Sequence, residues 1–106
     1  MLDHDLKAPY YAVIFVSRKS ENLEGYAEMD ERVMALAKEQ DGYLGYESAG
    51  DLKQGIFISY WESLEAIDKW RRNPIHIEAK AKAIDWYAYY HTQISRVEQA
   101  RRFVKE

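Results

Sequence analysis

Apolar residues along this chain form patterns typical of strands in some segments and of helices in others. Residues 10 to 18 (YYAVIFVSR) are rich in β-branched and aromatic side chains, and they are apolar at odd and even positions alike. A strand with one face in water would alternate between apolar and polar residues. We therefore expect this strand to be covered on both faces.

A helical period follows from Leu23 to about Gln40. Its apolar positions form one stripe, as an amphipathic helix requires, and they are Tyr26, Met29, Val33, Leu36 and Ala37. The polar residues 20 to 22 precede the helix and are suited to cap it. Gly42 is expected to end it in a left-handed conformation.

Two more strands are predicted at residues 43 to 49 and 55 to 62, joined by a hairpin loop with a glycine at each end. In the second strand one face carries Ile56, Ile58 and Tyr60, and the other carries Phe57, Ser59 and Trp61. Neither face is fully polar, so this strand also should be covered on both sides.

The remaining elements are two short helices and a last strand. Ser63 is a good N-cap for a helix that buries Ala66, Ile67 and Trp70. Asn73 and Pro74 interrupt the helical pattern and are suited to cap and begin a second helix. Residues 87 to 97 read as a strand. The charged residues 98 to 106 are expected to be helical or frayed.

The element order is strand, helix, strand, strand, helix pair, strand, which is that of a split βαβ, or ferredoxin-like, α+β fold with an antiparallel sheet. At 106 residues the chain is one domain, here placed at residues 9–100, with a flexible N-terminal arm at 1–8 and a charged C-terminal tail at 101–106. Helices would cover one sheet face only. The apolar second face predicts a homodimer packed sheet to sheet.

Composition and motifs argue against several classes of partner, site and chemistry. The net charge of -3 argues against a nucleic-acid partner, and no apolar run approaches the ~20 residues of a membrane span. The chain has no cysteine, which excludes disulfides and thiolate chemistry. The three histidines lie far apart, so no metal site is expected. A cytoplasmic location is the default expectation, since no targeting segment is recognisable.

A family resemblance appears in the second half of the chain. The segments Tyr60-Trp61-Glu62-Ser63, Glu65-Ala66, Trp70, Asn73-Pro74-Ile75-His76-Ile77-Glu78-Ala79 and Trp86-Tyr87, with Tyr90, resemble the antibiotic biosynthesis monooxygenase family of the dimeric α+β barrel superfamily. The resemblance covers about residues 9 to 100. It implies a homodimer in which the two sheets form a barrel and each protomer has a pocket between its sheet and its helices. It also implies an enzymatic activity, because some relatives oxidise polycyclic phenols or quinols with O2 and without metal or flavin.

Other relatives degrade haem, and their pattern fits this chain less well. That pattern pairs an asparagine in the first strand with a tryptophan and an axial histidine on the second helical segment. Trp70 matches the tryptophan, the histidine position falls at Lys80, and the first strand has no asparagine. A lysine ammonium is a poor iron ligand, although His76 lies about one helical turn away.

His76 and Trp61 are the candidate catalytic residues. A histidine with an ordinary pKa near ~6.5 is able to remove a phenolic proton at physiological pH, and Trp61 is a candidate pocket wall that stacks on an aromatic ligand. The alternative interpretation is structural: Trp61 would be a core residue, and His76 would form a local hydrogen bond in the first turn of its helix.

The candidate substrate-binding residues are Tyr60, Trp70, Asn73 and Tyr87. Tyrosine hydroxyls are suited to orient an oxygenated ring, whereas Trp70 and Asn73 have structural alternatives as a core residue and a helix cap. The sequence thus predicts a monooxygenase that needs no cofactor and acts on a small aromatic phenol or quinol. The alternatives are a non-enzymatic small-molecule binding or stress-related module of the same fold, and a haem-binding or haem-degrading protein.

Overall fold

The computed structural model describes residues 2, 5–51 and 53–105. Its elements are β1 (Tyr10–Lys19), α1 (Tyr26–Ala37), β2 (Tyr43–Gly50), β3 (Gln54–Trp61), α2 (Leu64–Arg71), α3 (Pro74–Trp86) and β4 (Tyr87–Val97). The order is the predicted one, and the ferredoxin-like α+β fold is confirmed.

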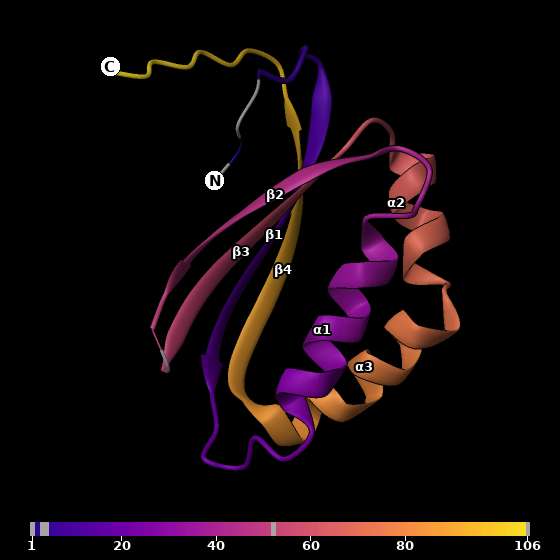
Figure 1. Cartoon of the computed structure of the whole chain (residues 1–106), viewed down its shortest axis with the longest axis vertical. Helices are drawn as coiled ribbons and strands as arrows, with labels where there is room; N and C mark the ends of the chain where they lie inside the picture. The colour runs from indigo at the N-terminus through magenta and orange to yellow at the C-terminus, as the bar shows by residue number, and fades with distance from the viewer. Residues whose placement is uncertain (1, 3–4, 52, 106) are drawn as a thin grey trace.

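The four strands form one antiparallel sheet in the order β2-β3-β1-β4, and the three helices lie on one of its faces (Figure 1). The central pair, β1 and β3, places Phe15 opposite Phe57 and Ile14 opposite Ile58. Successive residues of a strand point to opposite faces. The sheet therefore has a helix-covered face, which carries Phe15 and Phe57, and an outer face, which carries Ile14 and Ile58.

The core occupies one end of the space between the sheet and the helices. Its buried cluster is formed by Ala37, Trp61, Ala66, Ile67 and Trp70, and Tyr11 and Val13 of β1 pack against it. These residues come from the C-terminal end of β3, from α2 and from the end of α1. Further along β1 the helix-covered face carries Phe15 and Ser17, and there the space between the layers is a cavity.

Local signals fixed the caps of α2 and α3 as predicted. The Ser63 hydroxyl oxygen accepts a hydrogen bond from the Ala66 N–H at 3.0 Å, and Asn73 Oδ1 accepts one from the Ile75 N–H at 2.9 Å. Pro74 is the first residue of α3. Gly42 has a φ of 84°, as predicted, and a Cβ at this position would lie 2.6 Å from that of Ala66.

The start of α1 differs from the prediction. The helix begins at Tyr26, because the Tyr26 N–H bonds to the Leu23 carbonyl in a turn and Gly25 adopts a φ of 78°. No side chain caps it. Ser20, one of the residues 20–22 expected to cap it, instead donates its hydroxyl to the Asp85 carbonyl at 2.6 Å, which ties the end of β1 to the end of α3.

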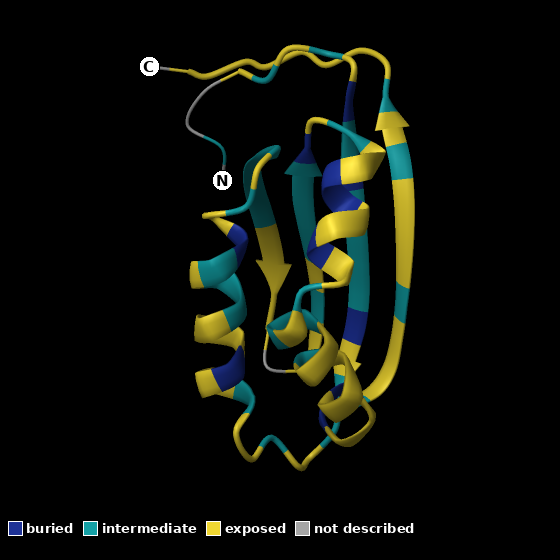
Figure 2. Ribbon diagram, turned by 90° about the vertical axis from the view of Figure 1, so that its right-hand side faces the viewer, coloured by how far each residue is buried: buried dark blue, intermediate teal, exposed yellow. Residues whose placement is uncertain are grey.

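The chain ends carry no helix within the described residues. Residues 98–105 lack regular structure and run beside the N-terminal segment (Figure 2), where Arg102 pairs with Asp5 at 3.8 Å. Residues 1, 3, 4 and 106 of the predicted arm and tail lie outside the described residues, so the boundaries at 8/9 and 100/101 stay predictions. Within the described ranges, no helix is long and apolar enough to cross a membrane.

Candidate functional site

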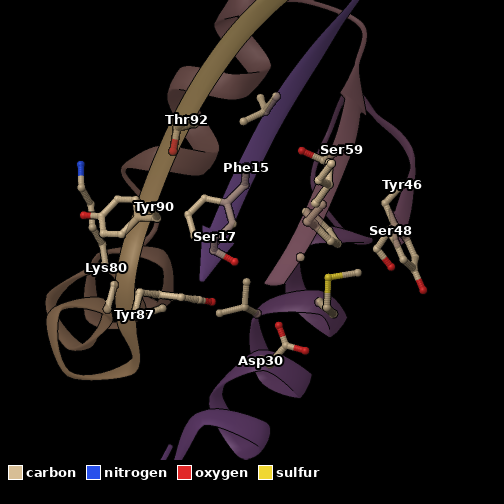
Figure 3. Close-up of a pocket in the computed structure, with 18 of the residues that line it drawn as sticks. Phe15, Ser17, Asp30, Tyr46, Ser48, Ser59, Lys80, Tyr87, Tyr90 and Thr92 are labelled. Carbon is tan, nitrogen blue, oxygen red and sulfur yellow. The ribbon is translucent and has the colours of Figure 1, made fainter. Parts of the chain in front are cut away.

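A cavity of about 770 Å³ lies between the helix-covered face of the sheet and the helices (Figure 3). All four strands and all three helices contribute to its walls. Principal lining residues are Val13, Phe15, Ser17, Met29, Asp30, Val33, Tyr46, Phe57, Ser59, Trp70, His76, Lys80, Ala83, Tyr87, Tyr90 and Ile94. Ile94 is 43% exposed, so the cavity opens to solvent along β4. A cavity of this size holds a drug-sized ligand.

Aromatic rings form much of the sheet side of this cavity. Phe15 lies 5.3 Å from Tyr87 and 5.5 Å from Tyr90, measured between ring centroids. Tyr46 stacks on Phe57 at 5.4 Å. Rings packed in this way present flat apolar surfaces, so the sheet side of the cavity is largely aromatic.

His76 lies in the first turn of α3 and borders the cavity beside Trp70, whose ring meets the imidazole edge-on at 5.2 Å. Burial lowers the pKa of His76 below its ordinary value of 6.5, and the positive charges of Lys80 and Arg71 lower it further. Its Nδ1 is buried and has no hydrogen-bond partner within the described part of the chain. The surroundings of His76 therefore favour its neutral form.

This depressed pKa predicts a pH dependence of stability. The unfolded chain protonates His76 as the pH falls through 6.5, whereas the folded chain resists protonation until the lower folded pKa. The stabilisation is thus fully present above 6.5 and is lost as the pH falls below it. Between about pH 7 and about pH 5, His76→Gln should show a smaller loss of unfolding free energy than the unmodified protein in urea titrations. Parallel pH profiles would contradict the assignment.

The cavity has a second polar region around Asp30 of α1. The Tyr87 hydroxyl donates to the Tyr26 hydroxyl at 3.4 Å, and Lys19 Nζ lies 5.5 Å from the Tyr26 ring centroid. Loss of solvent around its carboxylate raises the pKa of Asp30, and the charge of Lys19 opposes this. Burial also raises the pKa of Tyr87, helped by the Tyr26 hydrogen bond and the Asp30 charge. Ser17 is buried on the adjoining wall.

Three of the predicted site residues line the cavity: Trp70, His76 and Tyr87. The other three, Trp61, Tyr60 and Asn73, lie away from it. Trp61 is 1% exposed and stacks behind Trp70 at 6.4 Å, with its Nε1 donating to the Ser59 hydroxyl. It supports the wall from the core and has no access to the cavity, so the structural interpretation fits it.

The side chains of Tyr60 and Asn73 form hydrogen bonds away from the cavity. Tyr60 points to the outer face of the sheet, where its hydroxyl donates to Glu47 Oε1 at 2.7 Å. Burial and this hydrogen bond raise the pKa of Tyr60. Asn73 uses its side-chain oxygen to cap α3. Because neither residue lines the cavity, neither side chain is placed to contact a ligand bound there.

The prediction missed Ser17 and Asp30, although each left a signal in the sequence. Ser17 is the polar residue that continues the helix-facing series Val13 and Phe15 of β1. Asp30 follows Met29 and lies four residues after Tyr26, at the edge of the apolar stripe of α1. A polar residue on an otherwise apolar face is a candidate for ligand contact.

Within the described ranges, no group of three or more metal-ligating side chains is present. Lys80, at the position where haem-degrading relatives carry the axial histidine, lines the cavity. Among the described lining residues, His76 supplies the one imidazole.

Comparison with known proteins identifies the family. The family model described as antibiotic biosynthesis monooxygenase matches residues 9–82. An uncharacterised protein of Bacillus subtilis, YqjZ, is 46% identical over 97 residues, covering 90% of this chain and 85% of that protein. A variant of SnoaB, a cofactor-independent oxygenase from Streptomyces nogalater, superposes with a TM-score of 0.73 at 12% identity, over 93% of this chain and 100% of SnoaB. The protein PA3566 from Pseudomonas aeruginosa gives 0.70 at 11% identity, over 89% of this chain and 97% of that protein. The chain belongs to the antibiotic biosynthesis monooxygenase family.

Proposed function

We propose that this protein is a cofactor-independent monooxygenase that oxidises an aromatic phenol or quinol with O2. The observation that carries the proposal is the position of His76 on the wall of an aromatic-lined cavity of about 770 Å³, where its lowered pKa favours the neutral imidazole. The description of SnoaB as a cofactor-independent oxygenase supports the same activity for this chain.

The reaction begins with a proton transfer to His76. A phenolate gives up an electron to O2 far more readily than a phenol, so deprotonation by a neutral imidazole activates the substrate. Arg71 and Lys80, which line the same part of the cavity, stabilise the anion that forms. The substrate supplies all the electrons: one oxygen atom replaces the hydrogen at a ring C–H, the phenol becomes a quinone, and the second oxygen atom leaves as water.

Oxygen uptake tests the proposal directly. The purified protein, treated with a chelator, should consume one O2 per molecule of a fused-ring phenol and form the quinone seen by absorbance. Binding of such phenols without O2 uptake would favour the non-enzymatic binding module instead. Haemin added to the protein distinguishes the haem alternative, because ligation by a protein side chain gives a characteristic Soret band.

The functional unit in this proposal is a homodimer packed through the outer face of the sheet. That face is apolar along both central strands, with Ile14 and Val16 on β1 opposite Ile58 and Ile56 on β3. No helix covers it (Figure 1), and Ile56 is 47% exposed. An apolar face of this kind marks an association surface, and a second copy offers the same face in return.

Ile58→Asp should convert the dimer to a monomer, because it places a charge at the centre of the proposed interface. We expect sedimentation at the chain mass of 12.5 kDa, against twice that mass for the unmodified protein. The matched control is Ile84→Asp, at a position of α3 that is 80% exposed and lies off the sheet. An unmodified protein that sediments as a monomer at micromolar concentration would rule out the dimer.

A further inference from the structure

The cavity has titratable groups at two separate places along α3. His76 lies in the first turn of this helix, and Tyr87 follows its last residue, Trp86. At 1.5 Å per residue, ten residues of helix separate the two places by about 15 Å along the axis. Lys80 of α3 lies in between, among apolar and aromatic side chains that include Phe15, Met29 and Tyr90.

The region next to Tyr87 is built to accept a hydrogen bond from a ligand. The Asp30 carboxylate projects from α1 below Ser17 of β1, and the Tyr87 side chain enters from the start of β4 (Figure 3). The Tyr87 hydroxyl donates a long hydrogen bond, 3.4 Å, to the Tyr26 hydroxyl. Carboxylate oxygens therefore supply the main free acceptors in this region.

The charged neighbours of Asp30 leave its carboxylate free to accept a hydrogen bond from a ligand. Lys19 approaches from the end of β1, where it lies over the Tyr26 ring, and its charge favours the ionised form of Asp30. No ion pair joins Lys19 to Asp30 among the described residues. Asp30 is solvent-exposed and borders the cavity at its rim. A carboxylate without a direct ionic partner is free to accept charge-assisted hydrogen bonds from hydroxyl donors.

We propose that Asp30, together with Ser17 and Tyr87, binds a second hydroxyl group of the substrate at the end of the cavity opposite His76. The preferred ligand is then a fused-ring aromatic diol with hydroxyls on its two outer rings. His76 takes the proton of the first hydroxyl, and Asp30 accepts a hydrogen bond from the second and fixes which ring faces the base. This inference rests on the proposed function for the role of His76, while the contact with Asp30 concerns binding alone.

Anaerobic binding separates this inference from turnover. The probes are an anthracenediol with hydroxyls on its two outer rings and an anthrol that carries one of them, both followed by fluorescence titration without O2. The unmodified protein should bind the diol about tenfold or more tightly than the anthrol, since a hydrogen bond to a charged group has that value. Asp30→Ala should remove this preference and leave anthrol affinity within about threefold.

Two further variants make the test strict. Glu31→Ala removes a carboxylate from the next residue of α1, which is exposed and does not line the cavity, and it should keep the preference for the diol. Asp30→Asn keeps the shape and loses the charge, so an intermediate preference is expected. Circular dichroism verifies that each variant is folded.

The inference is overturned if Asp30→Ala keeps the preference for the diol, or if the unmodified protein binds the two probes equally or binds neither. Preference for the diol without O2 uptake would instead contradict the proposed monooxygenase and leave the Asp30 subsite in place. If the unmodified protein showed no preference for the diol and Asp30→Ala left O2 uptake unchanged, the Asp30 subsite would be contradicted. The proposed monooxygenase would then stand.

Discussion

Trp61→Ala should lower the free energy of unfolding by about 3–5 kcal/mol, the cost typical of truncating a large buried ring. Trp61 is 1% exposed and belongs to the core cluster. Its ring meets Tyr43 edge-on at 5.4 Å and stacks on Trp70 at 6.4 Å, and its Nε1 donates to Ser59 at 2.9 Å. Truncation removes these contacts together and leaves a cavity inside the core.

The measurement is urea unfolding followed by circular dichroism, with Trp61→Phe as the matched control. Phenylalanine keeps most of the apolar volume and loses the indole N–H, so its cost should be clearly smaller. Because Trp61 supports Trp70 from behind, Trp61→Ala should also weaken ligand binding at temperatures where the variant remains folded. A loss below about 1 kcal/mol would show that the core closes around the missing ring.

The elements of this fold could be predicted because their signals are local. Ser63, Asn73 and Pro74 act within three residues of their own positions, and the structure confirms all three. The predicted start of α1 was wrong because the Tyr26 N–H bonds to the Leu23 carbonyl in a turn and Gly25 has a positive φ, so the helix begins three residues later. Of the predicted capping residues 20–22, Ser20 bonds to the Asp85 carbonyl, 65 residues away, and Asn22 accepts from the Glu24 N–H, so neither caps the helix.

Periodicity does not identify the buried face where two faces of an element carry apolar residues. On α3 the residues Ile77 and Ile84 have the right spacing for a buried stripe, yet they are 55% and 80% exposed. The helix turns His76 and Ala83 toward the cavity instead. Pattern alone could not decide between these two faces, because the decision depends on how α2 and α3 pack on the sheet.

The positions of the predicted site residues also depend on packing. His76, Trp70 and Tyr87 line the cavity, whereas Trp61 lies one layer deeper. The sequence does not distinguish Trp61 from Trp70 as a cavity-lining residue. Only the packing shows that Trp70 lines the cavity and that Trp61 lies behind it. Asp30 and Ser17 lie on consecutive elements, and they become one polar region only when α1 packs beside the end of β1.

His76→Gln should reduce O2 consumption at physiological pH by about 10²–10⁴-fold, the usual contribution of a general base. Glutamine can form hydrogen bonds at this position but cannot take a proton. Anaerobic affinity for the anthrol should change by less than about threefold, so that the effect falls on the chemical step and not on binding. The control is His91→Gln, because His91 lies on the outer face and is hydrogen-bonded to Tyr89 at 2.7 Å.

The pH profile separates a base from a residue that only positions the substrate. With His76 neutral above its depressed pKa, the rate of the unmodified protein should rise with pH up to a value below 6.5 and then stay level. In His76→Gln the substrate must ionise in solution, so the rate should climb about tenfold per pH unit toward the phenol pKa near ~10. Recovery of activity at high pH in this variant alone would identify proton removal as the step that His76 performs. A rate lowered equally at every pH would assign His76 to positioning, and unchanged turnover would remove it from the mechanism.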